Sequence, residues 1–191
     1  KPVISISRNY PYKENFTHVL GYVSQANESD IENTEAIKKN FVPGLKVGKV
    51  GLEKSYEKKL IGTNDIERYE VNAYGRRISQ LEFQKGEKGK TLRLTIDTEV
   101  QKLANELLKD QAGSICVMDI YTGDVIAMHS SPSFDPNLFV FGISKDDWQL
   151  IRNNPMKPLV NKTLQGNYSP GSTIKPIVAL SALENGIINT N

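Results

Sequence analysis

The chain has 191 residues, with 24 Lys and Arg against 22 Asp and Glu, and a formal net charge of +2 at pH 7. A chain of this length can bury a core without disulfides or metals, and its near-neutral charge provides no strong field that would gather nucleic acid. The single cysteine, Cys116, excludes an intramolecular disulfide and a zinc site made of several cysteines. We therefore expect a folded, rather polar protein that does not bind nucleic acid.

The sequence contains no apolar run of the about 18 residues that a membrane-spanning helix needs. It begins at Lys1 and Pro2, without an initiator methionine or the charged and then apolar segments of a secretion leader. We interpret the chain as a piece of a longer protein.

The first part of the chain predicts short helices. Apolar residues in 30–41 are spaced as in a short amphipathic helix, which Pro43 and Gly44 end. A second helix is predicted over 52–60, where apolar residues recur at every fourth position. Charged residues cover its other side, and we expect Glu53 to face solvent with them.

Residues 67–83 predict a β-hairpin, because apolar and polar side chains alternate there. The next residues, 85–90, are charged and rich in glycine and have nothing to bury, so we place a domain boundary there. The sequence thus predicts a first domain over 1–90 and a second over 91–191.

The second domain is predicted to begin with a short strand over 92–96, followed by the clearest helix of the sequence. Asp97 or Thr98 can cap this helix, and Gln101 can complete a capping box. Apolar residues then form a stripe along one face of the helix as far as Leu108.

Two apolar runs, 114–120 and 125–128, predict a second hairpin whose strands are covered on both faces. A proline-rich loop leads from it to a helix predicted over 146–152, and a last helix is predicted to begin at Gly171. The expected fold class is α+β.

No arrangement for a metal or a cofactor is present in the sequence. His18 and His129 are isolated from each other and from the cysteine, and we expect each to be a surface or strand residue. Residues 88–91 lack the earlier glycine of a phosphate-binding loop. We therefore expect neither a metal nor a bound cofactor.

Nucleophilic catalysis is indicated by Ser172 and Lys175. A serine and a lysine three residues apart at a helix start lie on one face, so that the amine can reach the hydroxyl. A lysine acts as a base only when burial lowers its pKa from about 10.4, and we expect Ile177, Leu180 and Leu183 to bury the helix. The helix N-terminus favours a developing oxyanion, and Gly171 allows close backbone approach.

The spacing alone is weak evidence. With 14 serines and 18 lysines in 191 residues, chance predicts about one such pair. Indeed a second pair exists, Ser55 and Lys58, on the charged side of the helix predicted over 52–60. We interpret this second pair as accidental.

The surroundings of Ser172 make the first pair much more specific. Residues 168–176, YSPGSTIKP, resemble the active-site helix of penicillin-binding proteins, which carries a Ser-x-x-Lys motif. Further stretches resemble the class B enzymes of this family, and their elongation-specific group in particular. They are residues 18–22, 48–53 and 71–76 for the N-terminal module, and 94–97, 118–124, 131–137 and 142–148 for the transpeptidase part.

The resemblance implies an extended N-terminal pedestal followed by the truncated start of an α/β transpeptidase domain. It implies a peptidoglycan D,D-transpeptidase in which Ser172 forms an acyl-enzyme with stem peptides ending in D-Ala-D-Ala, and Lys175 is the base. β-Lactams would acylate Ser172 as covalent inhibitors. The pedestal would dock a polymerising glycosyltransferase and scaffold proteins of the elongation machinery on the periplasmic side of the inner membrane, with an anchor upstream of Lys1.

Two later motifs of the family, Ser-x-Asn and Lys-Thr-Gly, do not occur after Lys175. The resemblance therefore implies that this chain by itself is inactive or nearly so. A second interpretation is a pedestal that only docks partners, its catalytic half being absent or degenerate. A third, a Ser-x-x-Lys β-lactamase or β-lactam sensor, leaves residues 1–90 unexplained.

Overall fold

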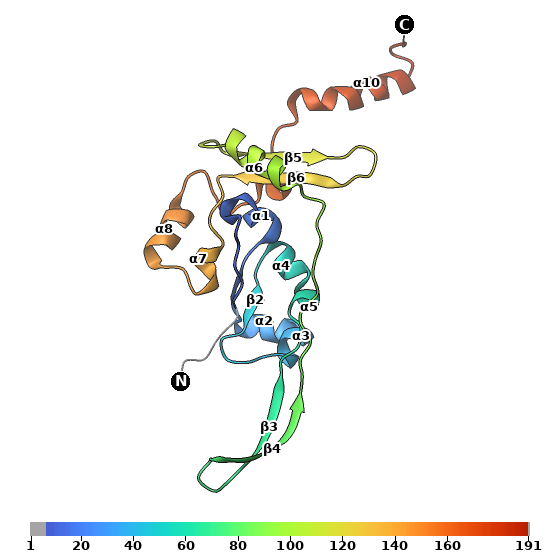
Figure 1. Cartoon of the computed structure of the whole chain (residues 1–191). Coiled ribbons are helices and arrows are strands. Elements are labelled where there is room, and N and C mark those ends of the chain that lie inside the picture. Colours follow the sequence, from blue (N-terminus) through green and yellow to red (C-terminus); the bar gives the residue numbers. More distant parts are fainter. Residues whose placement is uncertain (1–6, 191) are drawn as a thin grey trace.

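The structure is a computed structural model that describes residues 7–190. Residues 1–6 and Asn191, at the outer ends of the two predicted domains, lie outside the described part. The molecule is elongated, with a long hairpin at one end and the last helix at the other (Figure 1). Within residues 7–190 the strands form three separate two-stranded antiparallel sheets among helices, so the chain is α+β as predicted.

Short elements build the N-terminal part. In chain order they are η1 (Lys13–Asn15), α1 (Thr17–Leu20), β1 (Val23–Gln25), α2 (Glu28–Asn33), α3 (Glu35–Lys39), β2 (Lys46–Gly48), α4 (Gly51–Ser55) and α5 (Glu57–Leu60). Tyr10, Val23 and Val140 form a buried cluster at the side of β1. Val140 belongs to the C-terminal half of the chain, so this core is shared between segments that are distant in sequence.

Both helices predicted in this part are divided into two. The helix expected over 30–41 is α2 and α3, separated at Thr34, whose backbone is extended. Its start also differs, because Asn27 and Asp30 form a capping box that begins α2 earlier. The helix expected over 52–60 is interrupted at Tyr56, between α4 and α5.

Glu53 is buried, and the prediction that it faces solvent is wrong. Its carboxylate pairs with Arg8, with an Nε–Oε1 distance of 2.8 Å, and accepts a hydrogen bond from the Tyr10 hydroxyl at 3.2 Å. The same hydroxyl accepts one from Val23 N–H at 3.0 Å. The pKa of Tyr10 is raised, mainly by burial and to a lesser extent by the negative charge of Glu53. Glu53 therefore holds the segment before η1 against α4 and β1.

Gly21 ends α1 where α4 begins beside it. Its φ is +79°, and a Cβ there would lie 1.9 Å from the Val50 carbonyl oxygen. Only glycine satisfies both the left-handed backbone and this close approach. The turn between α1 and β1 is thus determined by the contact with the residues that precede α4.

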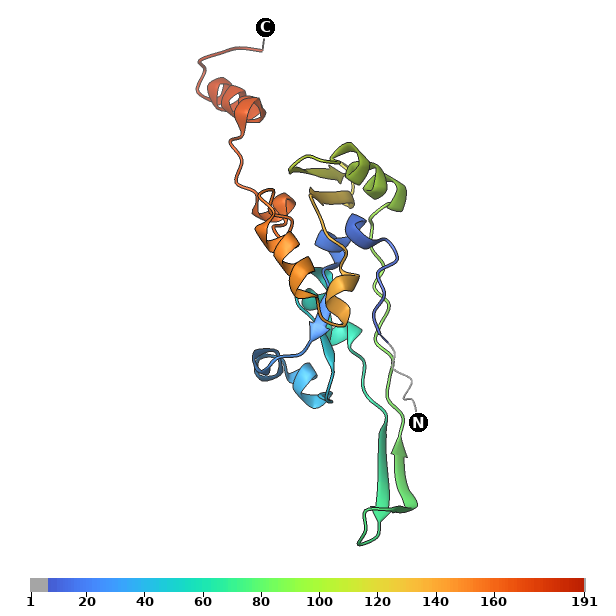
Figure 2. The ribbon, with the colours of Figure 1, turned by 90° about the vertical axis from the view of Figure 1, so that its left-hand side faces the viewer.

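The hairpin predicted over 67–83 is confirmed as β3 (Ile66–Val71) and β4 (Arg77–Gln84). It extends away from the other elements in both views of the ribbon (Figures 1 and 2). Hydrogen bonds at its base, from Thr63 N–H to the Glu87 carbonyl at 2.8 Å and from Gly86 N–H to Asp65 at 2.7 Å, hold the two legs together.

The C-terminal part contains α6 (Thr98–Leu107), β5 (Gly113–Met118), β6 (Val125–Ser131), α7 (Asn137–Val140), α8 (Lys145–Asn153), α9 (Lys162–Gln165), η2 (Gly171–Ile174) and α10 (Lys175–Glu184). The hairpin β5–β6 and the helix over 146–152 are confirmed. The strand expected over 92–96 is not formed. That segment is joined to the start of β6 only near its end, where Thr95 Oγ1 donates to the Val125 carbonyl and Asp97 N–H to that of Ile126.

The prediction that both strands of the hairpin β5–β6 are covered on both faces is confirmed for the end of β6 and wrong for β5. Helices α6 and α1 pack on β6, and three consecutive residues at its end, 129–131, are buried. In β5, by contrast, most side chains are exposed, including Met118 at its end. No helix within residues 7–190 has the length and apolar character needed to cross a bilayer.

Asp97 caps α6 as expected, accepting from the N–H groups of Glu99 at 2.8 Å and Val100 at 3.0 Å. Gln101 does not complete a capping box, and this part of the prediction is wrong. Its side chain is fully buried and donates to the carbonyls of Asn15 at 2.7 Å and Met128 at 2.9 Å. It also accepts from Met128 N–H at 2.8 Å. One amide therefore joins η1, α6 and β6.

Two imidazoles are buried at the same junction. His18 lies in α1 and His129 in β6, and the Nε2 atom of each is buried without a hydrogen-bond partner among residues 7–190. Burial, then the charge of Lys162, then His129, lower the pKa of His18 to about 4. Burial also lowers the pKa of His129. Both rings are therefore neutral at neutral pH.

Replacing Gln101 with leucine should destabilise the fold by about 2–4 kcal/mol, because three partly buried backbone groups lose their partner. Urea unfolding of the chain measures this loss. Gln149→Leu, at an exposed position of α8, is the matched control and should change the stability by less than about 0.5 kcal/mol. Equal effects of the two variants would show that the hydrogen bonds of the Gln101 amide do not stabilise the fold.

Acid should destabilise the junction through His18. An unfolded histidine binds a proton near pH 6.5, whereas folded His18 binds one only near pH 4. The contribution of neutral His18 to the free energy of unfolding is therefore fully present above about pH 6.5 and is lost progressively down to about pH 4. The full loss corresponds to about 3 kcal/mol, with about 2 kcal/mol of it reached by pH 5. Urea unfolding at pH 7 and pH 5 should show a clearly smaller loss for His18→Gln than for the unmodified chain. Parallel losses would contradict the assignment.

Candidate functional site

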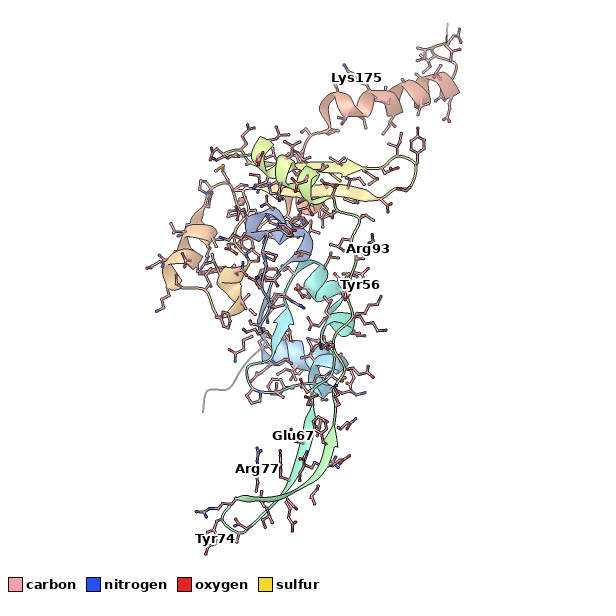
Figure 3. All side chains as sticks on the ribbon, in the orientation of Figure 1. Tyr56, Glu67, Tyr74, Arg77, Arg93 and Lys175 are labelled. Atoms are coloured by element: carbon pink, nitrogen blue, oxygen red, sulfur yellow. The ribbon has the colours of Figure 1, made fainter. Side chains whose placement is uncertain are left out.

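Ser172 and Lys175 lie on consecutive elements at the end of the molecule. Ser172 belongs to η2, and Lys175 is the first residue of α10. The N–H of Lys175 donates to the Ser172 carbonyl. The two residues therefore lie one turn apart, as predicted, although the serine occupies a 3-10 turn and not the helix itself. Figure 3 labels Lys175 at the end of α10 nearer to the rest of the chain.

Gly171 and Pro176 determine how α10 begins. Gly171 has a φ of +54°, and a Cβ on it would meet no atom within 4 Å. Glycine is thus required at this position for the left-handed backbone. The close approach of the backbone to a neighbour that we expected here is not observed. Pro176 is accommodated in the first turn of α10, where the missing N–H costs no helical hydrogen bond.

The apolar enclosure expected around Lys175 is not formed by residues 7–190. Ile177 is 63% exposed, Leu180 is also exposed, and the element that chiefly contacts α10 is η2. Lys175 and Ser172 are both exposed, and none of the hydrogen bonds within residues 7–190 joins their side chains. Apolar residues nevertheless surround the axis of α10, which is typical of a helix that is buried on all sides.

The second Ser-x-x-Lys pair has a different geometry. Ser55 ends α4, Lys58 lies in α5, and the helix is interrupted between them at Tyr56. Both side chains are exposed. No continuous helix turn relates the two residues, which supports their interpretation as an accidental pair.

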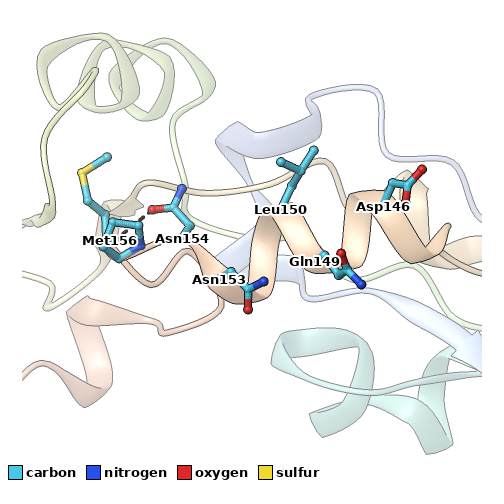
Figure 4. Close-up of a pocket in the computed structure, with 7 residues that line it drawn as sticks. Asp146, Gln149, Leu150, Asn153, Asn154 and Met156 are labelled. Carbon is cyan, nitrogen blue, oxygen red and sulfur yellow. Dashed lines mark hydrogen bonds between the residues drawn. The ribbon is translucent and has the colours of Figure 1, made fainter.

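The hollow along α8 lacks a nucleophile. A cavity of about 630 Å³ runs along α8 between Asp146 and Met156, and its lining includes Leu150 (Figure 4). Asn154 Oδ1 accepts a hydrogen bond from Met156 N–H in this lining, at 2.9 Å. Asp146 is the single titratable group of the lining, so the cavity offers no acid–base pair.

The histidines do not form a metal site. Among residues 7–190 no group of three or more His, Cys, Asp or Glu side chains could hold a metal ion. His129 is a strand residue, as expected. His18 is neither a surface nor a strand residue, because α1 inserts it between β6 and α9, where its ring meets Phe134 edge-on at 5.9 Å. The sequence contains one indication of this burial, the apolar residues that follow His18.

Two family models match the chain. Residues 2–94 match the penicillin-binding protein dimerisation domain, and residues 113–191 match the penicillin-binding protein transpeptidase domain. The chain is 44% identical to peptidoglycan D,D-transpeptidase MrdA of Escherichia coli over 186 residues. It is 36% identical to penicillin-binding protein 3 of Bacillus subtilis over 188 residues. These alignments cover 96% and 97% of this chain, but only 29% and 27% of the relatives.

Solved structures of two relatives have the same fold. One is penicillin-binding protein 2 of Helicobacter pylori in complex with MreC, with a TM-score of 0.84 and 36% identity over 97% of this chain and 34% of that one. The other is penicillin-binding protein 2 of Pseudomonas aeruginosa in complex with WCK 5153, with a TM-score of 0.80 and 38% identity over 99% of this chain and 38% of that one.

The match therefore includes both the N-terminal elements and the segment that carries Ser172, in one continuous alignment. The chain belongs to the penicillin-binding protein family, and it consists of the dimerisation domain and the start of the transpeptidase domain.

Proposed function

We propose that this chain is part of a peptidoglycan D,D-transpeptidase in which Ser172 is the nucleophile and Lys175 the base. The observation that carries the proposal is the pair itself, one turn apart at the start of α10, within the segment that matches the transpeptidase domain. The MrdA relatives carry this activity in their names. In the same reading, residues 1–90 are the pedestal and residues 91–191 the first part of the catalytic domain.

The reaction follows from the two side chains. The amine of Lys175 takes the hydroxyl proton of Ser172, whose Oγ attacks the carbonyl of the penultimate D-Ala of a stem peptide. The peptide bond to the terminal D-Ala breaks, and that residue leaves with the proton. An amine of a neighbouring stem then attacks the ester, which forms the crosslink and restores the Ser172 hydroxyl. A β-lactam reacts at the first step, because its ring carbonyl acylates Ser172.

Electrostatics at the start of α10 support the same role. The positive end of the helix dipole lies beside Ser172 and stabilises negative charge on an acyl oxygen. The exposed apolar sides of α10 and the exposed Lys175 also indicate that catalysis needs further protein around this helix. Residues 1–191 alone should therefore have little or no activity.

The proposed setting is the periplasmic face of the bacterial inner membrane, with an anchor upstream of Lys1. An elongation scaffold protein is the partner that we favour for the pedestal, because a relative with the same fold was solved in complex with MreC. A polymerising glycosyltransferase is proposed as a second partner. Docking without catalysis remains the alternative function, and partner binding that survives in an inactive Ser172→Ala protein is compatible with both.

Labelling by a fluorescent penicillin tests the catalytic proposal in the full-length protein. Ser172→Ala should abolish the covalent label, and Lys175→Ala should slow acylation by about 10²–10⁴-fold, the contribution of a general base. Ser55→Ala and Lys58→Ala are matched controls from the second pair and should label normally. Full labelling of Ser172→Ala, or no labelling of the unmodified protein, would refute the proposal.

A further inference from the structure

The distal half of the β3–β4 hairpin has an unusual surface. Residues 71–81 contain no acidic side chain, and both of their charges, on Arg76 and Arg77, are positive. Four large apolar side chains of this stretch are exposed: Val71, Tyr74, Ile78 and Leu81. Exposed apolar side chains that occur together with charges of a single sign usually mark an interaction site. We define residues 71–81 as the hairpin tip.

The acidic groups of the hairpin lie closer to its base and already have partners. Glu82 pairs with Arg68 at 2.7 Å, Glu67 accepts from the Tyr69 hydroxyl at 2.6 Å, and Glu70 accepts from Ser79 at 3.0 Å. None of the ion pairs within residues 7–190 includes an arginine of the tip. The two arginines of the tip therefore form no ion pair within residues 7–190, and the guanidinium of Arg77 lies over the Tyr69 ring, 4.2 Å from its centroid.

The turn at the tip is held in one conformation. Asn72 Oδ1 accepts from the N–H groups of Tyr74 and Arg76, each at 3.0 Å. The backbone closes the turn through Asn72 N–H to the Arg76 carbonyl at 3.0 Å, and Gly75 has a φ of +73°. Tyr74, which is 90% exposed, is thus presented outward by an ordered turn, as Figure 3 shows. Binding through this residue requires little further ordering.

The β5–β6 hairpin provides a natural comparison. Its turn exposes Tyr121 to 92%, but Asp119 and Asp124 flank it. Hydrogen bonds from Thr122 N–H and then Tyr121 N–H lower the pKa of Asp119, so this carboxylate is charged at neutral pH. The two turns therefore expose the same aromatic ring with opposite charge.

We infer that the hairpin tip binds the surface of an anionic phospholipid bilayer. Tyrosine prefers the headgroup region, where its ring is apolar and its hydroxyl remains hydrated, and exposed apolar neighbours add buried area. Arginines near an anionic surface each strengthen binding by about fivefold. The turn of β5–β6 has the aromatic ring but repels the same surface.

The direction of the hairpin agrees with this assignment. The hairpin tip and α10 lie at opposite ends of the molecule (Figure 1). A bilayer that contacts the hairpin tip therefore leaves Ser172 far from the lipid surface. The inference goes beyond the proposed reaction and does not depend on it, because lipid binding does not involve Ser172.

Co-sedimentation of the chain with vesicles tests the inference. Vesicles of phosphatidylglycerol and phosphatidylethanolamine should bind the chain, vesicles of phosphatidylcholine should bind it far more weakly, and added salt should weaken the binding. The double variant Arg76→Gln with Arg77→Gln should lose about 25-fold in partitioning. Tyr74→Ser should lose several-fold, whereas the matched control Tyr121→Ser should bind as the unmodified chain does.

A second measurement locates the contact. In a Trp148→Phe background, which removes the single natural tryptophan, Tyr74→Trp should show a blue-shifted emission that brominated lipids quench, and Tyr121→Trp should show neither. Absence of binding to phosphatidylglycerol vesicles, or equal losses for the Tyr74 and Tyr121 variants, would overturn the inference. The hairpin tip would then be assigned to a protein partner.

Discussion

The buried amide of Gln101 is the interaction on which the arrangement of the chain depends. It bonds to Asn15 in the N-terminal part and to both backbone groups of Met128 in β6. Neighbouring hydrogen bonds reinforce the junction, from Thr17 to the Phe134 carbonyl at 2.6 Å and from Asn161 to the His18 carbonyl at 3.1 Å. The N-terminal segment is thus tied to the C-terminal part by polar contacts as well as by apolar packing.

The segment that leads toward Ser172 is attached to this junction through α9. Strand β6 carries Ser130, whose hydroxyl donates to the Val160 carbonyl at 3.2 Å and accepts from Lys162 N–H at 2.9 Å. These bonds hold α9 against β6, and the chain leaves α9 directly toward η2. The attachment to the junction ends at α9, because η2 and α10 chiefly contact each other.

Both ends of the molecule expose apolar side chains that no other element within residues 7–190 covers. The middle contains the buried residues, while the hairpin tip and α10 expose theirs. Exposed apolar patches of this kind are usually contacts with a membrane or with further protein. The two surfaces differ in composition. The hairpin tip combines apolar side chains with two arginines, whereas α10 carries apolar residues on all sides of its axis. We interpret the first as a lipid contact and the second as a helix that functions inside a larger domain.

Local patterns predicted much of the secondary structure. The alternation over 67–83, the cap at Asp97 and the helix over 146–152 each depend on neighbours within a few residues, and each is confirmed. Division of the early helices at Thr34 and Tyr56 was missed, because the apolar spacing continues across both breaks. The prediction of a strand over 92–96 is wrong for a related reason. Alternation of apolar and polar residues does not show whether another strand lies alongside to pair with the segment.

The sequence by itself determined the α+β class, the two hairpins and the pair of Ser172 and Lys175, because these follow from spacing along the chain and from resemblance to a family. Only the tertiary structure decided the roles of Glu53, Gln101 and His18. Each has polar partners or neighbours that are distant in sequence, and one-dimensional patterns assign such residues to solvent or to caps. The exposure of α10 was likewise decided in three dimensions, because burial depends on what packs against a helix and not on its composition.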